Sequence, residues 1–318
     1  MIKGTWVTAV LMALGSPLGA QTRPDVIYGD DDRRDLYQVE TQKVLELADS
    51  TVALFSAANV TLDGEQGLAR LATRPYGASM RLCPEEPFYD QRMGAFCSGS
   101  LIAPDIVMTA GHCVTSDSDC ADTKFVFGFG IRKKGELPET VAVGDVYGCQ
   151  KLIGREELSS GADWALVRLD RPAQGHRPLS LNRAGDPETD SLIFVIGHPA
   201  GLPTKVAGGA KVRDPSLSGY FTANLDTYAG NSGSAVFNAR TGLIEGILVR
   251  GEMDYVWKGS CRVSKVCEED GCRGEDVTKA SSVIPRIPPQ AQPLRLVSLG
   301  GLSEALGRVQ AELATAGR

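Results

Sequence analysis

The sequence has few histidines, no long apolar run beyond its first residues and little excess charge. Only His112, His176 and His198 occur among 318 residues, so chemistry that uses an imidazole is confined to three positions. After the N-terminal segment, no stretch is apolar for long enough to span a membrane. The formal net charge of -6 argues against nucleic acid or an anionic membrane as a partner. The 42% of hydrophobic residues is enough to build a buried core in one or two domains.

The paired close spacings of a zinc site, such as C-x2-C, are also missing. An even number of cysteines in an exported chain favours disulfides instead, although the spacing alone leaves their connectivity open. The eight cysteines are Cys83, Cys97, Cys113, Cys120, Cys149, Cys261, Cys267 and Cys272. We therefore expect no metal site.

The N-terminus is typical of a secretory signal peptide. Lys3 is followed by an apolar stretch through Leu14 and then by small residues that end at Ala20. A buried helix is the alternative. No cysteine near Ala20 could carry a lipid, so residues 1–20 predict a soluble protein that is secreted or periplasmic.

The middle of the chain is rich in short apolar segments between turn residues, which is typical of an antiparallel sandwich or barrel. The expected strands are Phe125–Ile131, Trp164–Leu169, Leu192–Gly197, Ser234–Phe237 and Leu243–Val249. Prolines between Pro285 and Pro293 predict a linker. After it, Leu302, Leu306, Val309 and Leu313 share one helical face, which predicts a C-terminal helix that docks on the barrel or forms a free tail.

A serine surrounded by small residues is the first candidate for chemistry. Ser232 lies in the sequence GNSGS, and Gly230 precedes it by two residues. Small residues allow a sharp turn in which the amides of Gly230 and Ser232 point at one spot, as an oxyanion hole requires. An ordinary glycine turn would give the same short pattern.

A serine nucleophile needs a base and a carboxylate that orients the base, and the chain offers both. His112 lies in TAGHCV after an apolar run, where it could be a metal ligand, a buried hydrogen-bonding residue or a general base. Asp163 opens an apolar strand, where it could cap a turn or orient an imidazole; Asp170 is a weaker rival at the end of that strand. His176 and His198 are interpreted as structural or exposed.

Together, these motifs resemble the chymotrypsin-like serine proteases, in which the same residue types follow in the order His, Asp, Ser. FCSGSLIAPDIVMTAGHCV, ADWALVRL and GNSGSAVF match the three catalytic segments of that family. The resemblance covers about residues 26–285 and implies an all-β fold of two six-stranded antiparallel barrels. Residues 286–318, beyond it, hold the predicted linker and C-terminal helix. It also implies that His112 and Asp163 come from the first barrel and Ser232 from the second, and that Cys97 and Cys113 are bonded.

Within the family, GNSGS resembles the secreted bacterial glutamyl-endopeptidase branch. Other members carry Asp where Asn231 stands, and that Asp pairs with a newly made N-terminus; Asn231 cannot form this ion pair. The segment VIYGDDDRRDL from Val26 resembles the mature start of the branch. Residues 21–25 are therefore a candidate propeptide, with an extension that stays attached as the alternative.

The specificity pocket of such enzymes is lined by the segment before the serine and by a later strand. The corresponding residues are Asp226, Thr227, Leu248 and Arg250. Thr227 would suit a substrate carboxylate, but Leu248 offers it no cation. Asp226 stands where trypsin-type enzymes have the acidic residue that binds a Lys or Arg side chain of the substrate. Cleavage after basic residues is therefore expected first. Arg250 could neutralise Asp226 or attract an acidic residue, which keeps cleavage after Glu, Asp or apolar residues open.

The resemblance thus predicts a serine endopeptidase that acts on protein or peptide substrates through an acyl-enzyme, without a cofactor or metal, and as a monomer. A catalytically silent binding module and an esterase with the same triad are the alternatives. Further expected cysteine pairs are Cys120 with Cys149 and one link within Cys261, Cys267 and Cys272, with Cys83 taking the remaining thiol.

Overall fold

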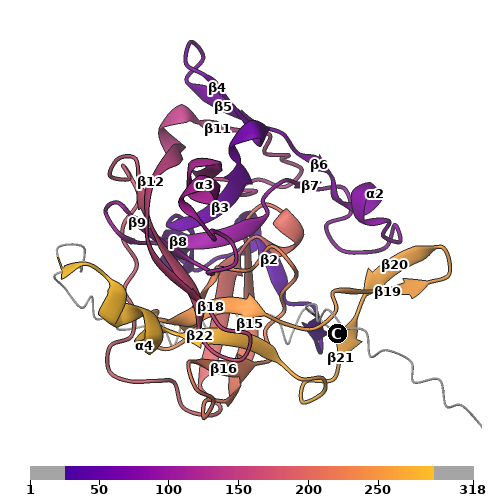
Figure 1. The fold of residues 1–318 in the computed structure, drawn as a ribbon. Helices are drawn as coiled ribbons and strands as arrows, with labels where there is room; N and C mark the ends of the chain where they lie inside the picture. The colour runs from indigo at the N-terminus through magenta and orange to yellow at the C-terminus, as the bar shows by residue number, and fades with distance from the viewer. Residues whose placement is uncertain (1–25, 290–318) are drawn as a thin grey trace, which may run out of the picture.

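The computed structural model describes residues 26–289, and its strands form two barrels that pack against each other (Figure 1). The predicted signal peptide, the candidate propeptide and the predicted C-terminal helix lie outside these residues. The last described elements are the short helix α4 (Ala280–Val283) and the 3-10 turn η5 (Ile284–Arg286).

The first barrel is closed by six antiparallel strands. Its order around the barrel is β10-β12-β13-β9-β8-β3, and β10 pairs with β3 to close it. The strands are β3 (Thr51–Ser56), β8 (Cys97–Ala103), β9 (Ile106–Thr109), β10 (Thr123–Val126), β12 (Val146–Glu157) and β13 (Asp163–Leu169).

The second barrel is also a ring of six antiparallel strands. Its order is β14-β17-β18-β22-β16-β15, and β14 pairs with β15 to close the ring. The strands are β14 (Leu192–Gly197), β15 (Lys205–Asp214), β16 (Tyr220–Ala223), β17 (Ala235–Asn238), β18 (Ile244–Arg250) and β22 (Glu275–Lys279). The predicted fold of two six-stranded antiparallel barrels is confirmed.

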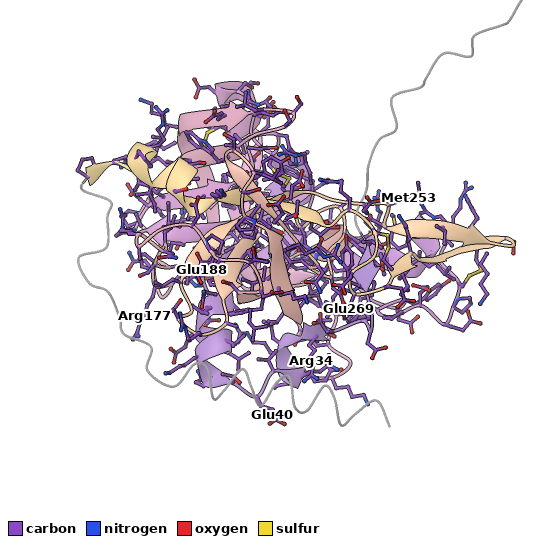
Figure 2. The ribbon with its side chains drawn as sticks, turned by 90° about the horizontal axis from the view of Figure 1, so that it is seen from below. Arg34, Glu40, Arg177, Glu188, Met253 and Glu269 are labelled. Carbon is purple, nitrogen blue, oxygen red and sulfur yellow. A yellow bond between two sulfur atoms is a disulfide. The ribbon has the colours of Figure 1, made fainter. Side chains whose placement is uncertain are left out.

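An N-terminal strand, β2 (Arg33–Asp35), joins the second barrel by pairing with β15. A buried ion pair between Lys205 Nζ and Asp35 Oδ1, at 2.7 Å, fixes this strand to the barrel. Glu40, a few residues later, points away from the body of the molecule (Figure 2). The N-terminal segment is thus part of the second barrel's sheet, although it precedes the first barrel in the chain.

Smaller elements surround the barrels. Hairpin β4–β5 projects from one end of the molecule, and α2 lies opposite hairpin β19–β20, near Met253 (Figures 1 and 2). The short strands are β1 (Ile27–Tyr28), β4 (Val60–Asp63), β5 (Leu68–Leu71), β6 (Arg74–Pro75), β7 (Arg92–Met93), β11 (Thr140–Ala142), β19 (Tyr255–Lys258), β20 (Cys261–Ser264) and β21 (Val266–Cys267). The remaining helices and 3-10 turns are η1 (Leu36–Gln38), α1 (Gln42–Ala48), η2 (Ala57–Asn59), α2 (Tyr76–Met80), α3 (Asp117–Ala121), η3 (Val143–Asp145) and η4 (Pro199–Gly201).

Four of the five predicted strands match the observed ones to within one residue at each end. The fifth, predicted over Phe125–Ile131, begins two residues earlier and ends at Val126. The prediction was wrong beyond that point because the chain turns there: the Gly130 amide donates to the Gly128 carbonyl at 2.8 Å. The aromatic residues that follow still pack in the core, although they are not in a strand.

One apolar core runs through both barrels. It includes Met108 and Leu166 of the first barrel and Phe194 and Ile247 of the second, all nearly or fully buried. Within residues 26–289, four smaller clusters lie apart from it; one is built from strands of the second barrel, and another includes residues of β3 and β10 of the first. Because the two barrels share apolar contacts, loops from each can meet at a fixed distance across the boundary.

Four disulfides link the described residues. Cys97 is bonded to Cys113, as the resemblance implies, and Cys120 is bonded to Cys149, which was predicted separately. The remaining bonds are Cys267–Cys272 and Cys83–Cys261, the latter joining the segment after α2 to hairpin β19–β20. Within residues 26–289, no helix is long and apolar enough to cross a membrane.

Candidate active site

The side chains of His112 and Asp163 meet at one end of the first barrel. His112 follows the end of β9, and Asp163 is the first residue of the neighbouring strand β13. The distance from His112 Nδ1 to Asp163 Oδ2 is 2.8 Å. The other carboxylate oxygen accepts hydrogen bonds from the backbone amides of Gly111 at 2.5 Å and His112 at 3.2 Å. Both oxygens of this buried carboxylate therefore hold the histidine loop.

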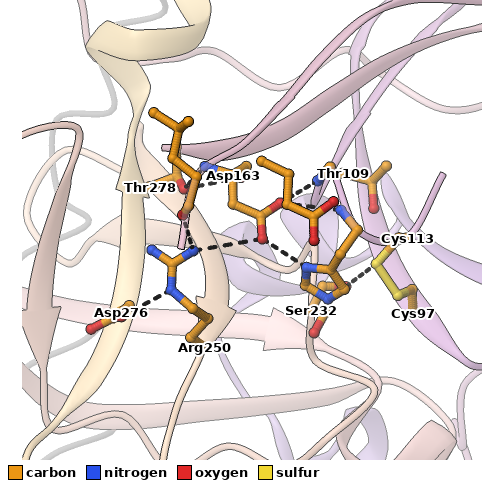
Figure 3. A network of polar contacts seen from close by, with 12 residues as sticks. Cys97, Thr109, Cys113, Asp163, Ser232, Arg250, Asp276 and Thr278 are labelled. Carbon is orange, nitrogen blue, oxygen red and sulfur yellow. Dashed lines mark hydrogen bonds and ion pairs between the residues drawn. A yellow bond between two sulfur atoms is a disulfide. The ribbon is translucent and has the colours of Figure 1, made fainter. Parts of the chain in front are cut away.

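The second barrel anchors the backbone of Asp163. The hydroxyl of Thr278, on β22, accepts a hydrogen bond from the Asp163 amide at 2.9 Å and donates one to the Asp163 carbonyl at 3.0 Å. Thr278 is fully buried. One hydroxyl thus satisfies both backbone groups of Asp163 and fixes that residue against the opposite barrel (Figure 3).

Ser232 lies on two consecutive turns before β17. The Asn231 amide donates to the Tyr228 carbonyl at 2.9 Å, and the Ser234 amide donates to the Asn231 carbonyl at 2.8 Å. The third residue of each turn is a glycine with positive φ, 101° at Gly230 and 90° at Gly233. This combination is the pattern of type II turns, in which glycine is favoured at the third position. Ser232 is therefore the second residue of the second turn.

The two turns leave backbone donors available. Among the described residues, neither the Gly230 amide nor the Ser232 amide donates to another protein group. Ser98 of β8 braces the same loop: its amide donates to the Ser232 carbonyl at 2.8 Å and its hydroxyl to the Gly230 carbonyl at 2.8 Å. The Gly230 and Ser232 amides can therefore donate hydrogen bonds to a substrate oxygen that develops negative charge.

Ser232 lies beside the Cys97–Cys113 disulfide that adjoins His112 (Figure 3). Within residues 26–289, no hydrogen bond joins the Ser232 hydroxyl to the imidazole. Such bonds are often long in structures without substrate and tighten in the complex. The sulfurs of Cys97 and Cys113 lie close to the imidazole, but their disulfide leaves no thiolate to ligate a metal.

The four residues predicted to line the specificity pocket are all engaged within the protein. Asp226 accepts hydrogen bonds from the Tyr28 amide at 2.7 Å and the Asp32 amide at 3.1 Å, so the N-terminal segment covers its carboxylate. Thr227 donates to Glu275 Oε2 at 3.0 Å. Leu248 packs in the core of the second barrel. These contacts do not favour a direct role of Asp226 in binding a basic side chain.

Arg250 neither contacts Asp226 nor reaches into open space. Its Nη1 lies 3.7 Å from Asp163 Oδ2, the oxygen that contacts His112. Its other partners are the Asp276 carboxylate and two backbone carbonyls of residues 158 and 161. Arg250 therefore belongs to the surroundings of Asp163, which the sequence did not indicate.

Burial changes the ionisation of the Asp226 region. Removal from water raises the pKa of Asp226 to about 7, against the lowering effect of the Tyr28 and Asp32 amides. The same loss of solvent, together with the nearby Asp226 charge, raises the pKa of Asp32 well above its usual range. The neighbouring guanidinium of Arg33 stacks on the Tyr228 ring at 4.0 Å and pairs with Asp31 at 2.7 Å.

The other two histidines lie apart from this site. His198 is fully buried, and its Nδ1 lies 3.0 Å from the Leu202 carbonyl. Burial lowers the pKa of His198 to about 3, so it stays neutral. The His176 ring stacks on Phe127 with ring centres 4.0 Å apart, and its Nε2 lies 3.3 Å from Asp145. Both have structural contacts, as the sequence interpretation expected.

A cavity of about 580 Å³ opens beside the Gly230 amide. Part of its wall comes from the segment between β3 and β8, including Met80, Met93 and Phe96. The remaining lining residues are Asn59, residues 72–74, Gly94, Ala95, Ala200, Ala229, Gly230 and Asp254. The cavity has apolar and polar walls and includes Gly230 of the candidate oxyanion site, so it can hold part of a bound chain.

Comparison with known proteins agrees with this arrangement. A model of the trypsin-like peptidase domain matches residues 97–247, which include His112, Asp163 and Ser232. Residues 97–247 thus form a trypsin-like peptidase domain. Human chymotrypsin-like elastase family member 3B is 40% identical over 105 residues, which is 30% of this chain and 37% of that protein. Bovine proproteinase E is 34% identical over 87 residues, covering 26% of this chain and 34% of that protein.

The chain thus spans little more than a third of the length of these curated relatives. Among solved structures, the active form of the Rv3671c protease from M. tuberculosis is 16% identical, with a TM-score of 0.44 over 90% of this chain and 97% of that one. None of these matches separates the glutamyl-endopeptidase branch from the rest of the protease family, so that assignment stays a prediction.

The sequence motifs identify the histidine, aspartate and serine segments, but they do not identify the residues that hold these segments in place. Thr278 and Asp276 lie in a strand with no recognisable motif, and Ser98 lies in the histidine segment without any sign that it contacts the serine loop. The cover over Asp226 comes from residues about 200 positions earlier, as the Tyr28–Asp226 separation of 198 shows. Nothing in the local sequence signals such contacts, because they depend on how segments that are distant in the chain pack together.

Proposed function

We propose that this chain is a serine endopeptidase in which His112, Asp163 and Ser232 form the catalytic triad. The contact between His112 Nδ1 and Asp163 Oδ2 at 2.8 Å carries the proposal. It directs Nδ1–H to the carboxylate and leaves Nε2 to take the proton of a serine hydroxyl. The trypsin-like peptidase domain supports hydrolysis of peptide bonds. The disulfides, which leave no free cysteine among the described residues, support export of the protein, with residues 1–20 removed as the signal peptide.

In the proposed reaction, Ser232 Oγ attacks the carbonyl carbon of the scissile bond while His112 accepts its proton. The amides of Gly230 and Ser232 stabilise the oxyanion of the tetrahedral intermediate. His112 then protonates the leaving amine, and an acyl group remains on Ser232. Water, deprotonated by His112, releases the acyl group and restores the serine. Asp163 orients the imidazole throughout.

The substrate is proposed to be an extended protein or peptide chain. The cavity that Gly230 lines supports this, because Met80, Met93 and Phe96 add apolar surface to the same cavity. Asp226 is covered by the amides of Tyr28 and Asp32, so we propose that preference at the scissile bond does not depend on an ion pair with Asp226.

The test compares wild type with Ser232→Ala and with Ser100→Ala, which removes a buried hydroxyl that has no partner among the described residues. Each protein is treated with a fluorophosphonate probe, measured by intact mass, and incubated with unfolded casein. We expect labelling and digestion by wild type and Ser100→Ala, and a loss of several orders of magnitude in kcat for Ser232→Ala.

Labelling without digestion by wild type would instead favour an esterase with the same triad. Absence of labelling in a folded wild-type protein would favour a catalytically silent binding module. A Ser232→Ala protein that keeps more than about a tenth of wild-type kcat would refute the nucleophile assignment.

A further inference from the structure

Arg250 is held in one position by four groups. Its Nε donates to Asp276 Oδ2 at 3.1 Å, its Nη1 to the Leu158 carbonyl at 3.0 Å and its Nη2 to the Gly161 carbonyl at 2.7 Å. The guanidinium also lies over the Tyr220 ring, 5.5 Å from its centre. A planar guanidinium with donors in three directions suits such a set, whereas a single ammonium does not match its geometry.

These contacts connect the two barrels at Asp163. Arg250 ends β18 of the second barrel, while residues 158–161 form the loop that leads into Asp163 of the first barrel. The same Nη1 that binds the Leu158 carbonyl lies 3.7 Å from Asp163 Oδ2 (Figure 3). Arg250 thus fixes both the loop before Asp163 and the position of the oxygen that receives His112 Nδ1.

The charges around this point are balanced. Arg250 and Arg273 face the carboxylates of Asp163 and Asp276, and Arg273 Nη1 lies 2.5 Å from Asp276 Oδ1. Removal of Arg250 leaves two buried carboxylates with one guanidinium, and it frees two backbone carbonyls. Uncompensated buried charge drives rearrangement, so the Asp163 carboxylate would lose its fixed orientation.

We propose that Arg250 is a positioning residue for the Asp163–His112 pair, acting from the opposite barrel, and not a residue that binds the substrate side chain. The consequence for catalysis rests on the proposed function above. The effect on the geometry of the pair does not, and the experiment reads the two separately.

The variants are Arg250→Met, which keeps an unbranched apolar side chain without charge, and Arg250→Lys, which keeps the charge. Arg171→Met is a matched control. Arg171 also binds two backbone carbonyls, at 3.0 and 2.9 Å, one carboxylate at 3.0 Å and one aromatic ring at 4.0 Å, but it lies on the first barrel after β13. Both methionine variants therefore lose an arginine with the same kinds of contact, but of the two arginines only Arg250 lies beside Asp163.

The first readout is the proton NMR signal of the His112 Nδ1–H in selectively labelled protein. A proton held against a carboxylate resonates far downfield, and with three histidines in the chain His112→Ala assigns it. The His198 Nδ1–H, which faces the Leu202 carbonyl, is an internal reference. We expect the His112 signal to broaden or move upfield in Arg250→Met, to be partly restored in Arg250→Lys and to stay unchanged in Arg171→Met.

The second readout is kcat and KM per active site, titrated with the fluorophosphonate, on a small peptide ester or amide. We expect kcat of Arg250→Met to fall at least about tenfold with KM within twofold, partial recovery in Arg250→Lys, and wild-type values in Arg171→Met. An unchanged His112 signal, an unchanged kcat per active site, or a raised KM with kcat preserved would each overturn the proposal. If wild type neither labels nor cleaves, the proposed function fails, and the NMR signal alone decides the role of Arg250.

Discussion

Replacing Thr278 with valine removes one hydroxyl and leaves two backbone groups of Asp163 without a partner. The hydroxyl accepts from the Asp163 amide at 2.9 Å and donates to the Asp163 carbonyl at 3.0 Å, and both residues are buried. Valine has nearly the same shape as threonine, so the substitution changes the hydrogen bonds while the packing volume stays similar. Water cannot easily replace the lost contacts.

The size of the effect follows from these two bonds. A buried backbone donor or acceptor without a partner costs about 1–3 kcal/mol, and the added methyl group recovers part of that. We therefore expect Thr278→Val to lower the free energy of unfolding by about 2–4 kcal/mol. For a domain of this size, that corresponds to a decrease of roughly 5–15 °C in Tm.

Thr51→Val is the matched control. Thr51 is also buried in a strand, but its hydroxyl has no hydrogen-bond partner among the described residues. Replacing an unpaired buried hydroxyl with a methyl group is expected to leave stability unchanged or to raise it slightly. Thr278→Ser, which keeps the hydroxyl, should lose less stability than Thr278→Val.

The assay is urea unfolding followed by tryptophan fluorescence, together with kcat per active site for the folded variants. Because Thr278 holds the backbone of Asp163, we also expect kcat of Thr278→Val to fall by about tenfold. Equal stability losses in Thr278→Val and Thr51→Val would show that the hydroxyl does not anchor Asp163. Full kcat in Thr278→Val would show that the anchoring has no part in catalysis.

Two further predictions concern buried ionisable groups. Burial raises the pKa of Asp226 to about 7, so the protonated carboxyl stabilises the fold at low pH and this contribution is lost as the pH rises through about 7. We expect Asp226→Asn to flatten this pH dependence of the free energy of unfolding in denaturant titrations and to leave the residue preference for tripeptide substrates unchanged. Loss of a preference for basic residues in this variant would instead make Asp226 a specificity residue. Burial lowers the pKa of His198 to about 3, so the unfolded chain takes up a proton at this histidine as the pH falls below about 6.5, and the free energy of unfolding decreases from there. We expect His198→Gln to lose less stability than wild type between pH 7 and pH 4.5. Equal losses in the two proteins would show that His198 is not held neutral by burial.

The local sequence was sufficient to predict most of the strands and the types of residue at the candidate site. Apolar segments such as Leu192–Gly197 predict strands because neighbouring side chains alternate between the two faces of a sheet and both faces are covered in a barrel. Glycines on either side of Ser232 predict sharp turns because few other residues adopt a positive φ. These features depend on residues near one another in the chain, so the sequence alone indicates them.

The tertiary structure decided which residues support the candidate triad and which are unavailable to a substrate. Asp226 has the spacing of a pocket residue, but an N-terminal segment 198 residues earlier in the chain covers it. Arg250 lies beside Asp163 and not beside Asp226 because β18 and β13 belong to different barrels that meet at this point. The first contact arises from the N-terminal segment packing on the second barrel and the second from the packing of the two barrels against each other, and no pattern within either segment encodes them.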